Sequence, residues 1–199
     1  MKEAWKGIGL RVIDKDMSCI LTGRTWYLEI FKEHMPKEVL GQIITLAGEV
    51  PGRCAQFLAN PEGNQAELYI TPTGVENLYV KALQLQAHQR VARPTDVVID
   101  QGTTLFRIYA DEEGNTYPVP EPVYNMIAAS FCEADEEYYG AFHDNLGWIY
   151  WISTECVFAI SPYYGVLENN ESYCRTMEWM KGKANADTKA EGCEEEEEA

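Results

Sequence analysis

Several of the patterns that identify a class of protein are absent from this chain of 199 residues. It has no apolar run near the ~20 residues that a membrane-spanning helix needs, and its start, MKEAWKGIGLRVID, lacks the apolar core of a secretion signal. No Gly-rich phosphate-binding loop and no internal repeat are visible. These absences predict a cytoplasmic protein that has no membrane contact and uses no cofactor.

A cysteine or histidine pattern typical of a metal site is missing as well. The six cysteines include no CxxC pair and are widely scattered, and the three histidines lie far apart in the sequence. These residues are Cys19, Cys54, Cys132, Cys156, Cys174 and Cys193, with His34, His88 and His143. Acidic clusters at 14–16, at 111–113 and at 135–137 with Asp144 could supply oxygen ligands for Ca²⁺ or Mg²⁺, but the spacing of an EF-hand is absent. We therefore expect reduced thiols and no metal site.

The most informative absence is that of positive charge. No Lys or Arg occurs from Ile108 to Cys174, whereas the residues before this segment hold 12 basic and 12 acidic side chains. The segment 108–174 itself contains 12 of the 32 acidic residues of a chain whose formal net charge is −16. Charge of one sign is normally relieved by interspersed Lys and Arg. The compensation could come from basic residues earlier in the chain, from a bound cation or from a positively charged partner.

Carboxylates and aromatic rings are mixed at the centre of this segment, in FCEADEEYYGAFHDNLGWIYW. Carboxylates two residues apart on a strand are separated by ~7 Å, and those three or four apart on a helix by ~5–6 Å, which is close to the spacing of successive phosphates. Exposed aromatic residues among them would act as interface anchors. The predicted contact residues are Asp111, Glu112, Glu113, Glu133, Asp135, Glu136, Glu137, Tyr138, Tyr139 and Asp144.

These features predict an acidic interaction protein that binds a basic protein surface. Proteins that bind nucleic acids neutralise phosphates with Lys and Arg. The most specific form of the prediction is therefore a nucleic-acid-mimicking inhibitor of a DNA- or RNA-binding enzyme, of the anti-restriction or anti-CRISPR type. An immunity-type protein that neutralises a basic toxin would show the same features. Direct binding of nucleic acid is not expected, because the negative charge repels phosphate, and the oligomeric state is left open.

A thiol hydrolase is the alternative from the class of enzymes. Cys54, in PGRCAQF, sits where a helix is expected to begin, and a helix N-terminus lowers the pKa of a thiol. His143 could act as its base, with the adjacent Asp144 orienting that base. The simpler interpretation is that Cys54 is a small buried residue, so no catalytic residue is assigned.

The hydrophobic periodicity predicts an α+β fold. We expect a single domain over residues 1–180, with an antiparallel sheet and three to four helices. The remainder, 181–199, has low hydrophobicity and ends in a run of Glu, which predicts a disordered acidic tail.

The predicted elements follow from periodicity, turn residues and caps. Strands are expected at 7–14, 18–23, 24–31, 67–72, 96–100, 103–110, 116–120, 147–152 and 155–160. Helices are expected from Pro36 to Pro51, over 53–59, over 74–90 after a capping box formed by Thr73 and Glu76, and from Pro122 onward. The last helix should direct Val123, Met126, Ile127 and Phe131 inward.

Overall fold

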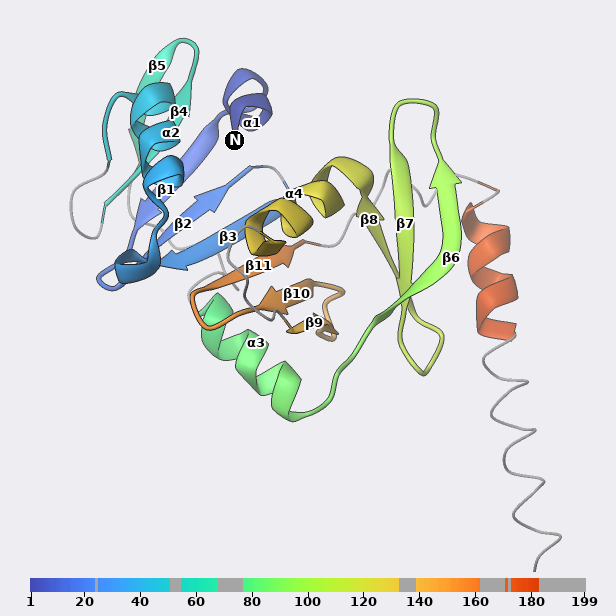
Figure 1. The fold of residues 1–199 in the computed structure, drawn as a ribbon. Helices are drawn as coiled ribbons and strands as arrows, with labels where there is room; N and C mark the ends of the chain where they lie inside the picture. Colours follow the sequence, from blue (N-terminus) through green and yellow to red (C-terminus); the bar gives the residue numbers. More distant parts are fainter. Residues whose placement is uncertain are drawn as a thin grey trace, which may run out of the picture.

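Eight antiparallel strands form the larger of two sheets in the computed structural model (Figure 1). The structure describes residues 1–23, 25–50, 55–67, 77–132, 139–161, 171 and 173–182. The strands of this sheet are β1 (Leu10–Asp14), β2 (Ser18–Thr22), β3 (Trp26–Phe31), β4 (Gln56–Asn60), β5 (Gly63–Glu67), β9 (Tyr139–His143), β10 (Ile149–Ile152) and β11 (Cys156–Ile160). Their spatial order is β5-β4-β1-β2-β3-β11-β10-β9, so β5 and β9 are the two edges.

A smaller sheet of three antiparallel strands stands beside the larger one (Figure 1). It consists of β6 (Arg93–Asp100), β7 (Leu105–Ala110) and β8 (Thr116–Pro120), in that order. A helix formed by residues 173–182 covers one face, where Met177 packs with Phe106. Tyr109, on the opposite face, belongs to the same buried cluster as Trp151 of the larger sheet. The two sheets therefore share a hydrophobic core.

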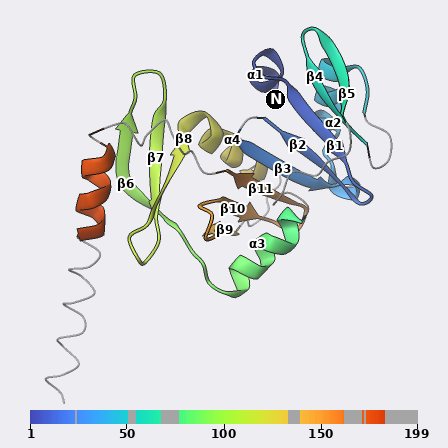
Figure 2. The same ribbon diagram turned by 180° about the vertical axis from the view of Figure 1, so that it is seen from behind.

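Helices cover both faces of the larger sheet. They are α1 (Lys2–Lys6), α2 (Lys37–Ala47), α3 (Leu78–Ala87) and α4 (Glu121–Cys132), with a short 3₁₀ helix η1 (Lys32–His34). Ile43 of α2 and Ile127 of α4 belong to the cluster on one face, and Leu78 and Ala82 of α3 to the cluster on the other. Figures 1 and 2 show α3 on the opposite side of the sheet from α2 and α4. Of the helices that the structure describes, none is long and apolar enough to cross a bilayer.

The interior strand β11 is buried at every residue because both of its faces are covered. Phe158 points to the α4 side, where its ring centroid lies 6.2 Å from that of Trp26 and 6.5 Å from that of Trp151. Val157 points to the α3 side. This position explains why CVFAI is a continuous apolar run without polar alternation.

The predicted α+β fold on an antiparallel sheet is confirmed. Strands β1 to β3 form the predicted meander, and β10 and β11 pair about Ser153–Thr154. The predicted helix after Pro36 is α2, but it ends at Gly48, before Pro51. Gly48 has a φ of 76°, a left-handed conformation in which glycine is the usual residue after a helix.

One predicted helix is wrong, and some elements were not predicted. Residues 56–59 of the predicted helix 53–59 belong to β4, because β1 and β5 pair with its two edges and satisfy its backbone groups. A short apolar run is compatible with either structure until its neighbours are known. The elements α1, η1, β5 and β9 were not predicted, and the helix over 173–182 extends into the predicted tail. The capping box at 73–76, most of the predicted strand 67–72, and residues 183–199 lie outside the described residues.

Candidate functional site

The β7–β8 hairpin carries three predicted contact residues, of which two face solvent. The Asp111 side chain is 5% exposed. Its carboxylate accepts hydrogen bonds from the Asn115 backbone N–H at 2.8 Å and from the Asn115 side-chain amide at 2.9 Å. Glu112 and Glu113 are exposed. Asp111 therefore stabilises the turn, whereas Glu112 and Glu113 lie at the surface.

Asp111 also belongs to a buried polar chain that reaches His143 at the end of β9. The Tyr117 hydroxyl donates to Asp111 Oδ2 at 2.9 Å and lies 2.8 Å from His143 Nδ1. Because the hydroxyl proton is directed to Asp111, the Tyr117 oxygen accepts its second hydrogen bond from the Nδ1–H group of His143. His143 Nε2 lies 3.6 Å from Asp111 Oδ2. Since Tyr117 and His143 are both buried, this chain joins the smaller sheet to the edge of the larger one.

The same contacts keep the Asp111 carboxylate charged. Burial by itself would raise its pKa, but hydrogen bonds from Asn115 and Tyr117 and the nearby His143 bring the pKa below its ordinary value. Burial and the hydrogen bond to Asp111 raise the pKa of Tyr117. The phenol therefore keeps its proton and remains the donor.

Folding stability should consequently depend on acid pH through Asp111. Its pKa is lower in the folded chain than its ordinary value of 3.8. Asp111 therefore stabilises the fold above that value, and this contribution is lost as the pH falls through the folded pKa. We expect the stability advantage of the wild type over Asp111→Asn to shrink from about pH 5 to about pH 3. Urea unfolding across this range measures it, and parallel pH profiles for the two proteins would contradict the lowered pKa.

Asp144, another predicted contact residue, is an internal acceptor. Its Oδ1 accepts hydrogen bonds from the backbone N–H groups of Leu146 at 2.9 Å and Trp148 at 3.0 Å, within the turn between β9 and β10. Its Oδ2 accepts from the Tyr150 hydroxyl at 3.1 Å and forms an ion pair with Lys81 of α3. The Asp144 side chain is 7% exposed. A basic residue from the neutral first part of the chain thus compensates this acid.

Further acids of the segment 108–174 have cationic or histidine partners within the protein. They are Glu121 with Arg107, Glu155 with His34, and Glu171 with Arg175. The Glu121–Arg107 pair is bidentate, with N···O distances of 2.6 and 2.9 Å. Two of these three bases, Arg107 and His34, precede the acidic segment. Pairing inside the protein therefore accounts for part of the expected compensation.

Tyr139 is the predicted contact residue whose position is most informative. It begins β9 and is 49% exposed, whereas residues 141–143 of the same strand are buried. It directly follows the run EADEEY. The other predicted contact residues, Glu133, Asp135, Glu136, Glu137 and Tyr138, lie outside the described residues. Tyr139 therefore places aromatic surface outside the core, directly after this acidic run in the sequence.

Of the alternative site formed by Cys54, His143 and Asp144, the structure describes the last two residues. His143 bonds to Tyr117, whereas Asp144 points to α3 and Tyr150, so Asp144 does not orient the imidazole. Cys54 lies outside the described residues, and its role as a nucleophile stays a prediction from the sequence.

Among the cysteine side chains that the structure describes, Cys19 and Cys156 are buried and Cys174 is half-buried. The Cys156 Sγ lies 3.6 Å from the Ser153 hydroxyl. Burial, followed by the charge of Asp14, raises the pKa of Cys19 to about 12, so this thiol stays protonated at neutral pH. Within the described ranges, no three His, Cys, Asp or Glu side chains come together in a way that could hold a metal ion.

The residues that hold the buried acids were missed by sequence reasoning. The alternation of TYPVP places Tyr117 on an inward face, but it does not say that the hydroxyl meets His143. Lys81 lies within a predicted helix, yet its partner Asp144 is far away in the sequence. A recognisable signal exists for Asp111, since an Asp that precedes a Gly-Asn turn commonly accepts hydrogen bonds from the turn backbone.

Comparison with known proteins gives no match to a family model, to a curated protein or to a solved structure. Charge, exposure and internal contacts are therefore the basis for assigning a function. Of these, exposure separates the predicted contact residues most clearly, because it divides Tyr139, Glu112 and Glu113 from Asp111 and Asp144.

Proposed function

We propose that the protein binds a basic protein surface through the part of its acidic segment around Tyr139. The observation that carries the proposal is the 49% exposure of this ring, directly after a run of acids without a nearby basic residue in the sequence. Aromatic residues frequently dominate the binding energy of interfaces. Carboxylates beside them favour a partner of opposite charge and speed its association.

The proposed contact set is smaller than the set predicted from the sequence. Asp111 and Asp144 are left out, because their carboxylates are buried and bonded within the protein. Tyr139, Glu112 and Glu113 remain from the described residues. The acids of the run EADEEY and Tyr138 stay in the set as a prediction from the sequence.

The most specific form of the proposal is a nucleic-acid-mimicking inhibitor of a DNA- or RNA-binding enzyme. The groove of such an enzyme presents Lys and Arg to phosphates, and a row of carboxylates can occupy it in their place. An immunity-type protein that neutralises a basic toxin is the second candidate, and the exposed Tyr139 ring and the acidic run before it support it equally. Competition separates the two, because a mimic and nucleic acid exclude each other from one groove.

Replacing Glu133, Asp135, Glu136 and Glu137 together by Lys should weaken binding to a basic nuclease by about 100-fold or more, since close charge pairs in an interface each contribute ~1.5 kcal/mol or more. Biolayer interferometry with the nuclease immobilised measures this loss. Binding of the wild type should also fall steeply between about 50 and 200 mM salt, as the exposed charges are screened. If the protein inhibits a nuclease by mimicking DNA, duplex DNA added to the complex should displace the protein from that nuclease.

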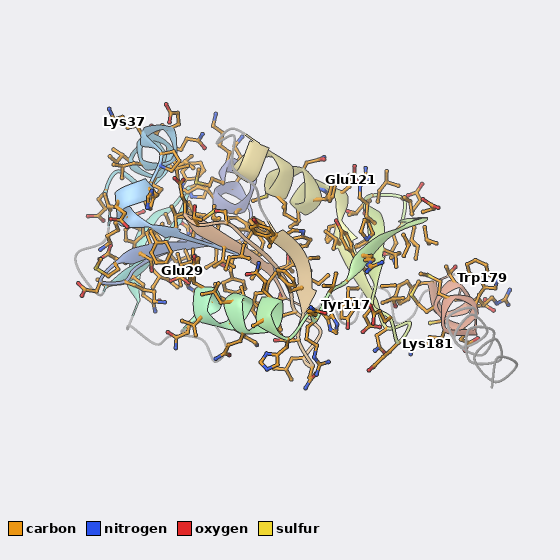
Figure 3. The ribbon with its side chains drawn as sticks, turned by 60° about the horizontal axis from the view of Figure 1, so that its bottom comes forward. Glu29, Lys37, Tyr117, Glu121, Trp179 and Lys181 are labelled. Carbon is orange, nitrogen blue, oxygen red and sulfur yellow. The ribbon has the colours of Figure 1, made fainter. Side chains whose placement is uncertain are left out.

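A matched control reverses Glu33, Glu38, Glu49 and Glu62, four acids that are exposed in the structure, and so changes the net charge by the same amount. These residues lie around α2, β4 and β5, at the end of the molecule marked by Lys37 in Figure 3. An equal loss of binding in both variants would show that only net charge matters. Undiminished binding in the first variant would reject the proposed surface, and thermal melting of both variants checks that they fold.

A further inference from the structure

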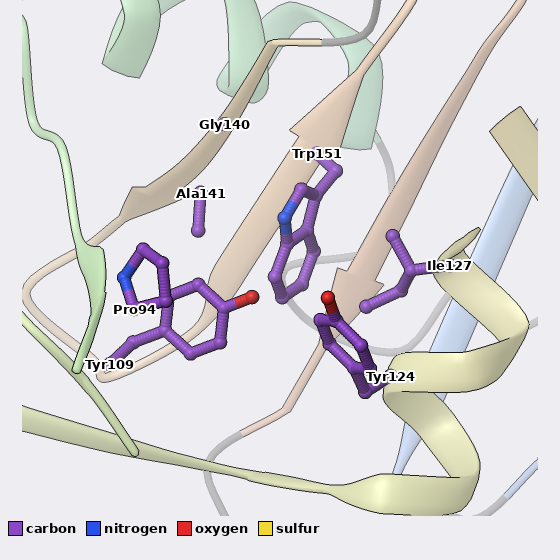
Figure 4. A pocket seen from close by; sticks show the side chains of 7 residues that line it. All are labelled: Pro94, Tyr109, Tyr124, Ile127, Gly140, Ala141 and Trp151. Carbon is purple, nitrogen blue, oxygen red and sulfur yellow. The ribbon is translucent and has the colours of Figure 1, made fainter. Parts of the chain in front are cut away.

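A cavity of about 160 Å³ lies between α4, β9, β10 and the smaller sheet (Figure 4). Its walls include Pro94, Tyr109, Tyr124, Ile127, Ala141 and Trp151. No charged side chain lines the cavity, and three of the lining side chains, those of Tyr109, Tyr124 and Trp151, are aromatic. An engineered cavity of similar size, about 150 Å³, in another protein binds benzene. The space therefore suits a molecule with a single aromatic ring.

Two hydroxyl groups make this cavity different from a purely apolar void. Figure 4 shows the hydroxyls of Tyr109 and Tyr124 pointing toward the same space beside the Trp151 ring. Tyr109 is itself fixed edge-on to Trp151, with ring centroids 5.8 Å apart and an interplanar angle of 85°. A hydroxyl can both donate and accept a hydrogen bond, so the pair can satisfy one hydroxyl group on a bound ring.

The cavity has an exposed side and a buried side. Pro94 and Gly140 are exposed and Tyr124 is half-buried, whereas Tyr109, Ala141 and Trp151 are buried. The cavity therefore opens to solvent on the side of the first three residues, with the Trp151 ring at its inner end.

Tyr124 is held at this opening by a pair of opposite charges. The Arg107 guanidinium lies 4.4 Å from the centroid of the Tyr124 ring, and its bidentate bond to Glu121 fixes its orientation. Glu121 and Tyr124 are three residues apart on α4 and therefore lie on the same side of the helix. Because Arg107 and Glu121 neutralise each other, the opening has an ordered aromatic wall without net charge.

We propose that this cavity is a binding site for a small neutral molecule with one aromatic ring and one hydroxyl group, a phenol. The ring packs against Trp151, and its hydroxyl bonds with those of Tyr109 and Tyr124. The formal net charge of −16 disfavours ligands that carry a carboxylate. The phenol site and the basic-partner surface are argued from different observations. Either proposal can therefore be rejected while the other stands.

Phenol titrated into the full-length protein should shift the indole N–H resonance of Trp151 in a saturable way. The chain has five Trp residues, and most of the other four indole resonances should stay in place. Cyclohexanol has the hydroxyl but no aromatic ring, and benzoate has the ring but a negative charge. Each should bind about tenfold more weakly than phenol. Binding of either one as tight as that of phenol would overturn the proposed ligand class.

Variants locate the binding in the cavity. Ala141→Leu places a larger side chain in the cavity and should abolish phenol binding, and Tyr124→Phe removes one hydroxyl and should weaken it by about three- to tenfold. Tyr79→Phe, on α3 and outside the cavity, should leave it unchanged. If Ala141→Leu does not fold, Ile127→Phe fills the space from α4. Phenol binding that survives both the filling variant and Tyr124→Phe would overturn the assignment.

Discussion

Replacing Asp144 by alanine is expected to lower the free energy of unfolding by about 3 kcal/mol. Asp144 accepts hydrogen bonds from two turn amides and from the Tyr150 hydroxyl, and it pairs with Lys81. Tyr150 is fully buried, and burial together with Asp144 raises its pKa, so its proton always needs an acceptor. The Lys81 side chain is 30% exposed, so water can take over part of its role, which places the loss at the lower end of the range for buried pairs.

Urea unfolding followed by circular dichroism measures this loss, and two variants serve as controls. Asp144→Asn keeps an oxygen for the turn amides and should lose less than Asp144→Ala. Glu112→Ala removes an exposed acid and should change stability by no more than about 0.5 kcal/mol. If Asp144→Ala were as stable as Glu112→Ala, the buried carboxylate would have no structural role and would return to the set of contact candidates.

Replacing Phe158 by alanine should cost about 3–5 kcal/mol, the usual range for a large aromatic residue in a packed core. Phe158 is completely buried in the interior strand β11, between Trp26 and Trp151. Its removal leaves a cavity at the junction of the two halves of the larger sheet. Thermal and urea unfolding measure the loss, and near-ultraviolet circular dichroism reports the altered packing of the two tryptophans.

Tyr139→Ala is the matched control for Phe158→Ala. Both changes remove an aromatic ring from a strand of the same sheet, but Tyr139 is 49% exposed. Its loss should reduce stability by less than about 1 kcal/mol while weakening binding to a basic partner. A loss of stability similar to that of Phe158→Ala would show that Tyr139 belongs to the core, which contradicts its proposed role as an interface anchor.

The parts of the fold that sequence reasoning predicted correctly are those specified locally. The hairpin of β10 and β11 has two apolar runs on either side of Ser153–Thr154, and α2 has a helical repeat that follows Pro36. By contrast, QFLAN is a strand because β1 and β5 lie on either side of it. Strand β5 follows β4 directly after a two-residue turn, but β1 and β4 are separated in the chain by β2, β3, η1 and α2, so no local pattern could reveal that pairing.

The predicted contact residues also divide into those whose position the local sequence specifies and those whose position depends on distant residues. The exposure of Glu112 and Glu113 follows from their place in a tight turn, and Asp111 has a turn signal of its own. The burial of Asp144 depends on Lys81, which α3 brings from a distant part of the sequence. Charge counting treated all acids of the segment alike, so it could not separate buried acids such as Asp144 from exposed ones such as Glu112.

The pairing of β3 with β11 has a consequence for how the protein is made. Residues 26–31 leave the ribosome long before residues 156–160, yet the two strands are neighbours at the centre of the larger sheet. Such non-local pairing slows folding, because a long loop must close before the contact can form. Until β11 arrives, one edge of β3 has no partner strand and can pair with another chain. The high density of like charge that we propose for partner binding would then also keep nascent chains apart during this interval.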